Sequence, residues 1–263
     1  MILDRFKLTD KVAIVTGAGK GIGKGIALAF AEAGADVVCA ARTMADIEAT
    51  SAEIEKLGRR ALPVQCDVMK TPDLDNLVAK TMETFGKIDI LVNNTGGTYP
   101  CSAMDTTEEF FEEALRFNVT TAFLLSQKVA REMVKTSEMG SIVNISSRSS
   151  DMVQTSFVAY GAAKAAMNMM TRNMAPEFAP KIRVNAISVG GVATDSLKVV
   201  LQNEAAREEF NRGTPMNRPG DVEDIAAAAL YLSSPAACWV TGKVFQIDGG
   251  VTAPAIWVPT API

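Results

Sequence analysis

Histidine is absent from this chain of 263 residues, and cysteine is scarce. The four cysteines, Cys39, Cys66, Cys101 and Cys238, are scattered and form no CxxC pair. Because zinc sites are built from clusters of Cys and His, we expect no metal site. The lack of histidine also excludes Ser-His and Cys-His catalysis, so any acid–base chemistry must use Tyr, Lys, Asp, Glu or Cys.

Long apolar runs and an excess of positive charge are lacking as well. No window approaches the roughly 18 apolar residues of a membrane span, and the first residues, MILDRFKLTDK, do not resemble a signal peptide. The net charge of -4 offers no basic surface for nucleic acid. We therefore expect a soluble, cytoplasmic protein that binds neither membranes nor nucleic acid.

Apolar strands alternate with amphipathic helices along the chain, which predicts a mostly parallel sheet. Predicted strands lie at 12–16, 36–40, 61–66, 88–93, 140–145, 182–187 and 243–247, and predicted helices at 21–33, 44–57, 72–85, 107–135, 159–178 and 222–232. Continuous apolar runs such as VAIV and DILVN are typical of strands covered on both faces. The sequence thus predicts one α/β domain over 1–263, a doubly wound (Rossmann) sheet of about seven strands with helices on both faces.

Three further features of the chain carry expectations. Pro176 and Pro180 should end the helix at 159–178 early, because proline cannot continue the hydrogen-bond ladder. An irregular stretch at 190–219 is expected to form a substrate loop. The apolar tail 251–263, which contains Trp257, should dock on its own domain or on a neighbour.

A glycine-rich turn follows the first predicted strand. It comprises Gly17, Gly19, Lys20, Gly21, Ile22 and Gly23. Glycines allow a tight turn and a close backbone approach, and the helix N-terminus that follows offers free N–H groups to a pyrophosphate. The turn therefore predicts a dinucleotide site.

The end of the second predicted strand indicates which dinucleotide is bound. NAD enzymes usually place an acid there to hold the ribose hydroxyls. Here the strand is followed by Arg42 and Thr43, with no acid before Asp46. A guanidinium suits a 2′-phosphate, and Lys20 adds a second positive charge. The sequence therefore favours NADP(H).

At this point the sequence resembles the short-chain dehydrogenase/reductase family over nearly its whole length. The resemblance is carried by Thr16-Gly17-x3-Gly21-Ile22-Gly23, by Asn93-Asn94-Thr95-Gly96, and by Asn118, Ser147 and Tyr160-x3-Lys164. It implies that Asp67 and Val68 contact the adenine, that Asn93 and Gly96 lie beside its ribose, and that Gly190, Val192 and Thr194 lie at the nicotinamide. Two departures stand out: Thr95 replaces the family's alanine, and Val189 replaces the proline before Gly190.

The resemblance also implies a catalytic group of Asn118, Ser147, Tyr160 and Lys164. Tyr160 and Lys164 are four residues apart on a predicted helix and so share a face. The ammonium is expected to lower the pKa of Tyr160, which would act as general acid or base on a ketone or secondary alcohol. Ser147 would position the substrate oxygen, and Asn118 would hold a water linking Lys164 to solvent.

The substrate is predicted to be a small carbonyl or alcohol compound with a bulky apolar body. Apolar residues fill the expected substrate loop and its neighbours: Leu197, Val199, Val200, Leu201, Phe210, Met216, Tyr99, Met152 and Val153. Within the family, the stretches 194–198 and 235–242 are similar to 7α-hydroxysteroid dehydrogenases, and the second also to 3-oxoacyl carrier-protein reductases. A 3-oxoacyl-thioester reductase and a non-catalytic NADP-binding sensor remain alternatives. Family members are commonly homodimers or homotetramers, built through the helices at 107–135 and 159–178.

Overall fold

The computed structural model describes residues 1–194, 197 and 201–255. Seven strands form one sheet in the order β3-β2-β1-β4-β5-β6-β7, and every neighbouring pair is parallel. The strands are β1 (Val12–Thr16), β2 (Asp36–Ala41), β3 (Ala61–Gln65), β4 (Ile90–Asn93), β5 (Gly140–Ser147), β6 (Ile182–Val189) and β7 (Val244–Ile247). The predicted doubly wound parallel sheet is confirmed.

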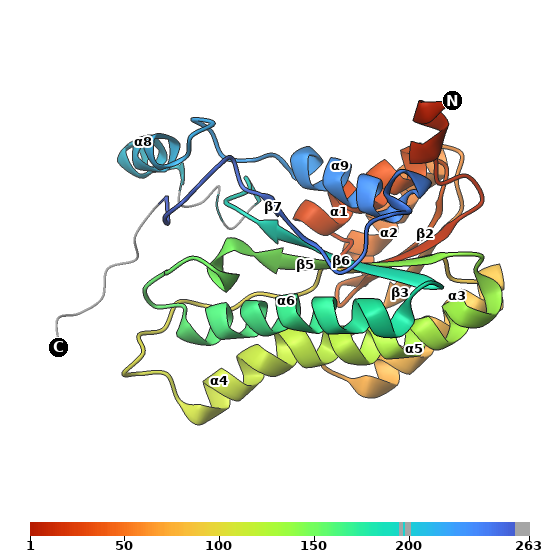
Figure 1. Cartoon of the computed structure of the whole chain (residues 1–263), viewed down its shortest axis with the longest axis horizontal. Helices are drawn as coiled ribbons and strands as arrows, with labels where there is room; N and C mark the ends of the chain where they lie inside the picture. Colours follow the sequence, from red (N-terminus) through yellow and green to blue (C-terminus); the bar gives the residue numbers. More distant parts are fainter. Residues whose placement is uncertain (195–196, 198–200, 256–263) are drawn as a thin grey trace.

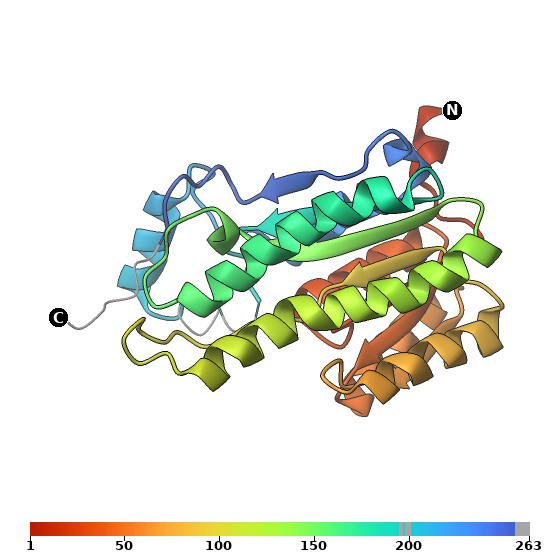
Figure 2. The same ribbon diagram turned by 60° about the horizontal axis from the view of Figure 1, so that its bottom comes forward.

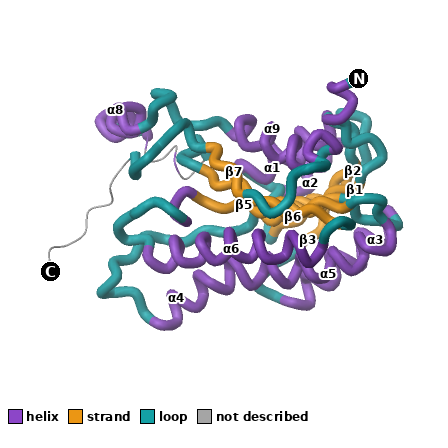
Figure 3. Tube along the Cα trace, viewed as in Figure 1, coloured by secondary structure: helices purple, strands orange, loops and turns teal. Residues whose placement is uncertain are grey.

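Helices cover both faces of the sheet (Figures 1 and 3). On one face pack α1 (Gly21–Glu32), α2 (Met44–Lys56) and α9 (Val222–Ser233), and on the other α3 (Thr71–Phe85), α4 (Glu108–Leu115), α5 (Thr121–Thr136) and α6 (Val158–Phe178). Each face has its own buried cluster, centred on Phe30 and Ile54 on one side and on Leu91 and Val129 on the other. Burial of apolar side chains on both faces explains the continuous apolar strands.

The chain reverses its winding direction between β1 and β4. From β1 the sheet extends through β2 to β3 at one edge, and from β4 it extends through β5 and β6 to β7 at the other. In doubly wound sheets, ligands bind at this switch point, outside the carboxyl ends of the strands. The carboxyl ends of β1, β4 and β5 carry Thr16, Asn93 and Ser147 to that edge.

The helix predicted over 107–135 is interrupted in the structure. A π-helical turn, Arg116–Thr120, joins α4 to α5, which lie end to end beneath the sheet (Figure 2). A π turn widens the helix by one residue, and such turns are frequent at functional sites. Here it contains the fully buried Asn118.

The expectation that Pro176 ends its helix early is wrong, because α6 continues through Pro176 to Phe178. A proline in the last turn removes one backbone donor but leaves the following residues helical. The helix ends at Phe178, because the next residue, Ala179, has an extended backbone (ψ 151°). An extended conformation is the one that a following proline, here Pro180, favours. The expected irregular stretch 190–219 is also wrong in part, since it contains α8 (Glu204–Gly213).

The tail turns back onto the domain as far as it is described. Val251 is 6% exposed, and a Cβ added to Gly213 would lie 2.9 Å from the Cα of Ala255. The rest of the predicted tail, including Trp257, lies outside the described residues. Among the residues that are described, no helix has the length and hydropathy needed to cross a membrane.

Candidate active site

The glycine turn brings the end of β1 and the start of α1 into close contact. Gly17 (φ +67°) and Gly21 (φ +53°) adopt left-handed backbone conformations, which favour glycine. A Cβ on Gly23 would lie 2.2 Å from the carbonyl oxygen of Gly17. No side chain caps the N-terminus of α1, so its backbone N–H groups remain available to an anion. These features fit a pyrophosphate.

At the end of β4, Asn94 lines the cleft at the place that was predicted for Asn93. The side chain of Asn93, 3% exposed, donates to Ser126 Oγ (2.9 Å) and to Asn144 Oδ1 (2.8 Å) in the buried layer below the sheet. It lines no cavity on the ligand side. Its neighbour Asn94, absent from the predicted set, faces the cleft and donates from Nδ2 to the carbonyl of Thr16 (2.9 Å). Successive side chains of a strand point to opposite faces, so Asn93 faces the buried layer and Asn94 faces the cleft.

A cavity of about 300 Å³ lies beyond the carboxyl ends of β1, β2 and β3. Among its lining residues are eight of the predicted cofactor residues: Gly17, Gly19, Lys20, Arg42, Thr43, Asp67, Val68 and Gly96. The side chain of Asp46 also lines it, and its Oδ2 lies 3.2 Å from Lys20 Nζ. Lys20 is therefore paired with Asp46, the first acid after the second strand, which opposes the second positive charge expected at the ribose site.

A second cavity, of about 790 Å³, adjoins the first and shares Lys20, Asn94 and Gly96 with it. Its lining contains the predicted residues Gly21, Ile22, Ser147, Tyr160, Lys164, Gly190, Val192 and Thr194. The structure therefore brings together residues from widely separated segments, between Gly17 and Leu197, along two adjoining cavities. Among the described residues, no three His, Cys, Asp or Glu side chains gather closely enough to hold a metal ion.

Lys164 is a buried cation at the floor of this cleft. Its side chain is 3% exposed, and Nζ donates to the carbonyl oxygen of Ile145 at 2.9 Å. Burial lowers the pKa of Lys164 to about 8, because a low-dielectric environment disfavours the charged form. Nζ lies 5.6 Å from the ring centroid of Tyr160, one helical turn earlier, within the range of a cation–π contact.

The pKa of Tyr160 moves opposite to the expected direction. Burial raises the pKa of the Tyr160 phenol, while its hydrogen bond with Ser147 acts to lower the pKa. Ser147 is held by a short relay: its hydroxyl donates to Ser149 Oγ (3.3 Å), which donates to Gln154 Oε1 (2.7 Å). Sequence reasoning missed Ser149 and Gln154, since two polar residues in a loop carry no distinctive signal.

Asn118 positions the loop after β4 rather than lining the cleft. Its Oδ1 accepts from the backbone N of Gly97 (2.9 Å), and its Nδ2 donates to the carbonyls of Gly97 (3.0 Å) and Ala114 (2.9 Å). A Cβ on Gly96 would lie 2.7 Å from Asn118 Oδ1 and 3.0 Å from Lys164 Nζ. Asn118, Gly96 and Lys164 are therefore adjacent, and both amide donors of Asn118 are occupied by the backbone.

A third cavity, of about 320 Å³, adjoins the second and shares Ser147, Val189, Gly190, Gly191 and Leu197 with it. Its other walls include Met152, Phe157, Phe210, Val251, Pro254 and Ala255. Of the other predicted substrate-loop residues, Tyr99, Val153 and Met216 are exposed and outside this cavity, and Val199 and Val200 lie outside the described residues.

The geometry fits a nucleotide-binding α/β enzyme, with Ser147, Tyr160 and Lys164 lining one cavity and Ser147 also lining the next. A family model described as enoyl-(acyl carrier protein) reductase matches residues 17–252. The chain belongs to the short-chain dehydrogenase/reductase family, whose members are oxidoreductases that use a nicotinamide cofactor. This agrees with the resemblance seen in the sequence.

Individual relatives differ in what they act on. The chain is 42% identical to the 7alpha-hydroxysteroid dehydrogenase of Escherichia coli strain K12, covering 94% of this chain and 96% of the relative. It is 39% identical to the NAD-dependent glycerol dehydrogenase of Listeria innocua, covering 94% and 96%. A solved structure of 7 alpha-hydroxysteroid dehydrogenase with NADH and 7-oxo glycochenodeoxycholic acid superimposes with a TM-score of 0.91 at 40% identity, covering 96% of this chain and 98% of that one.

Proposed function

We propose that this protein is an NADP(H)-dependent oxidoreductase that interconverts a neutral, bulky, apolar ketone and its secondary alcohol. The observation that carries the proposal is that Ser147, Tyr160 and Lys164 line one cleft, that Ser147 also lines the adjoining apolar cavity, and that Lys164 Nζ lies 5.6 Å from the tyrosine ring. A polar pair at the junction of a cofactor cleft and an apolar pocket is the arrangement that carbonyl reduction requires.

In the proposed mechanism, the bound nicotinamide supplies or accepts the hydride, and the chain handles the proton. The raised pKa of Tyr160 keeps its hydroxyl protonated at neutral pH, so it donates to the carbonyl oxygen as general acid. The Ser147 hydroxyl, which donates to Ser149 in the structure, turns to donate a second hydrogen bond to the same oxygen and orients it. The Lys164 ammonium stabilises the phenolate left behind, since an opposite charge nearby favours the ionised form.

Asn118 acts in this scheme by holding Gly96 and Gly97 against Lys164. We assign it a positioning role, with reprotonation of Tyr160 routed through Lys164 to solvent. The glycine turn would hold the pyrophosphate, and Asp67 and Val68 the adenine. Gly190, Val192 and Thr194 line the nicotinamide end of the cleft.

The preference for NADP(H) rests on charge at the ribose end. Arg42 is exposed in the cavity there and has no ion-pair partner among the described residues. An unpaired guanidinium at this position suits a 2′-phosphate. The Lys20–Asp46 pair acts against the preference, because an acid repels the phosphate and occupies the lysine. Arg42 therefore carries most of the selectivity.

The substrate class follows from the third cavity. Arg148 is its one charged residue within the described part of the chain, and that guanidinium is already paired with Asp151 and Asp248. An anionic group would find no free cation there, which favours a neutral apolar body over an acidic carrier. A ketosteroid has the required shape and polarity; a 3-oxoacyl thioester is the second candidate because Phe157, Phe210 and Leu197 also suit an acyl chain.

The test is nicotinamide absorbance with purified protein, NADPH or NADH, and a panel of ketosteroids, acyl thioesters, diketones and sugars. We expect oxidation of NADPH in preference to NADH, with a higher kcat/KM for bulky neutral ketones than for small ones. Turnover of sugars or thioesters alone would refute the substrate class. Tight NADPH binding without turnover of any carbonyl would favour a non-catalytic sensor.

We also propose a homodimer or homotetramer built through α5 and α6. Exposed apolar side chains lie on these helices: Phe123 and Val134 on α5, and Val158 and Met169 on α6. Such residues are enriched at interfaces between subunits. Light scattering at several protein concentrations tests this, and a monomer at all of them would refute it.

A further inference from the structure

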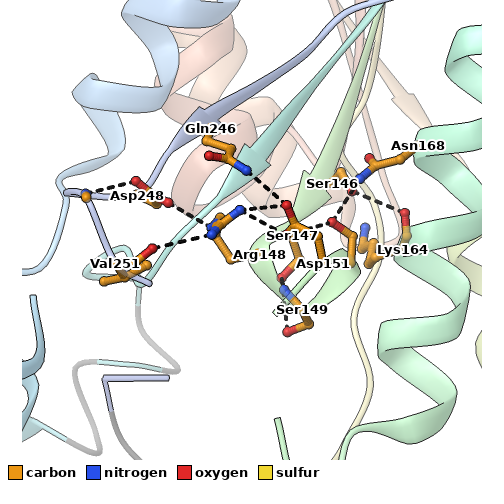
Figure 4. A network of polar contacts seen from close by, with 12 residues as sticks. Ser146, Ser147, Arg148, Ser149, Asp151, Lys164, Asn168, Gln246, Asp248 and Val251 are labelled. Atoms are coloured by element: carbon orange, nitrogen blue, oxygen red, sulfur yellow. Dashed lines mark hydrogen bonds and ion pairs between the residues drawn. The ribbon is translucent and has the colours of Figure 1, made fainter. Parts of the chain in front are cut away.

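Arg148 directly follows Ser147 and is the most connected side chain at the substrate cavity (Figure 4). Its NH1 donates to Asp151 Oδ1 (2.9 Å) and Oδ2 (2.7 Å), and its NH2 donates to the carbonyl of Val251 (3.3 Å). Its Nε lies 2.7 Å from Asp248 Oδ2. One guanidinium thus ties the end of β5 to the end of β7 and to the segment that follows β7.

Asp248 shapes the turn that directs the chain back toward the cavity. Its Oδ1 accepts from the backbone N of Gly250 (2.9 Å), and Gly249 (φ +69°) and Gly250 (φ +84°) have left-handed conformations. A Cβ on Gly190 would lie 2.6 Å from Asp248 Cα, so the two backbones are in close contact beside the cleft. The turn is therefore fixed both by its own hydrogen bond and by Arg148.

The segment after the turn forms a wall of the substrate cavity. Val251, Pro254 and Ala255 line it together with Ser147. No regular secondary structure is assigned to 251–255, so it depends on side-chain contacts for its position. Within the described residues, Arg148 NH2 donates to the carbonyl of Val251 (3.3 Å), and the turn before the segment is held by the Arg148–Asp248 pair, whose side chains are 11% and 10% exposed. A shielded ion pair of this kind is much stronger than an exposed one.

We propose that Arg148 is a positioning residue that holds 251–255 as a fixed wall of the cavity and thereby sets the preference for bulky over small ketones. The substrate preference rests on the proposed function, whereas the positioning of 251–255 by Arg148 rests on the geometry alone. Arg148 does not bind the substrate as a cation, because its charge is balanced by two carboxylates, Asp151 and Asp248, and NH1 and NH2 already donate to Asp151 and Val251. A small ketone would contact Ser147 and Tyr160 without touching the wall, whereas a bulky one needs both.

The test compares Arg148→Met, Asp248→Asn and the wild type. Asp248→Asn keeps an oxygen for Gly250 N and removes the charge that pairs with Arg148, so it serves if Arg148→Met folds poorly. The control, Arg60→Met, removes an ion pair with the buried Asp36 at 2.7 Å, remote from every cavity of the site. Hydrogen exchange over 248–255 is measured first, and then the kinetics with a ketosteroid and a small diketone.

We expect faster exchange over 248–255 in both site variants, with about a tenfold rise in KM for the ketosteroid and kcat for the diketone within about threefold of wild type. The control should change neither. Unchanged exchange, or an equal KM rise for both ketones, would overturn the inference. Absence of turnover by the wild type would refute the proposed function instead. Hydrogen exchange and ketosteroid binding to the NADPH-loaded protein would then still show whether Arg148 positions 251–255.

Discussion

Replacing Lys164 with methionine should abolish activity and yet stabilise the protein at neutral pH. Burial lowers the pKa of this lysine from 10.5 to about 8, so the folded protein holds its charge at pH 7 at a cost of roughly 3 kcal/mol, at about 1.4 kcal/mol per pKa unit. Methionine keeps the apolar stem but loses the hydrogen bond to Ile145 O, worth about 1 kcal/mol. The variant should be more stable by about 2 kcal/mol.

The pH dependence of the stability follows from the state, folded or unfolded, in which Lys164 binds its proton more tightly. The unfolded lysine titrates near 10.5 and the folded one near 8. Between these values the unfolded state holds more protons, so the wild type gains stability as the pH rises from about 8 toward 10.5. The gap between variant and wild type should therefore close by about pH 10.

Urea unfolding at pH 7, 8, 9 and 10, at one protein concentration, measures this gap. Lys135→Met is the matched control, because the Lys135 side chain is 64% exposed and carries no burial cost. A variant less stable than wild type at pH 7, or a gap that does not change with pH, would refute the reasoning that Lys164 is a destabilising buried cation kept for catalysis.

Three further predictions concern the cofactor. Arg42→Ala should raise the KM for NADPH about tenfold or more and leave that for NADH nearly unchanged, as measured by initial rates with each cofactor. Asp46→Asn should lower the Kd for NADPH several-fold, because it frees Lys20 and removes a repulsive charge; an unchanged Kd by fluorescence titration would contradict this. Gly23→Ala should eliminate binding of both cofactors, since its Cβ would lie 2.2 Å from Gly17 O, and binding within about tenfold of wild type would show that the turn adapts.

The fold was predictable because each strand is buried on both faces and therefore reads as a continuous apolar run. The glycine turn was predictable for a similar reason: the positive φ at Gly17 favours glycine, and a Cβ at Gly23 would clash with the Gly17 carbonyl. Local rules were enough for these features. Helical spacing places Tyr160 and Lys164 on a common face, but their catalytic role was indicated by the resemblance to the short-chain dehydrogenase/reductase family.

Features that depend on tertiary packing were not predictable. The π turn at Arg116–Thr120 exists where Asn118 bonds to the backbone of Gly97, a residue from another segment. Asn93 belongs to a buried polar network rather than to the cleft. The ties between Arg148 and Asp248 join residues a hundred positions apart, and no local pattern marks such a pair.

The central claim is that Tyr160 transfers the proton during reduction of a neutral ketone. The direct measurement is single-turnover NADPH oxidation by Tyr160→Phe beside the wild type, with NADPH affinity measured for both. The account predicts a loss of at least about 100-fold in rate, in the range general acid–base catalysis contributes, with cofactor affinity unchanged. A variant that retains most of its rate would contradict the assignment of Tyr160.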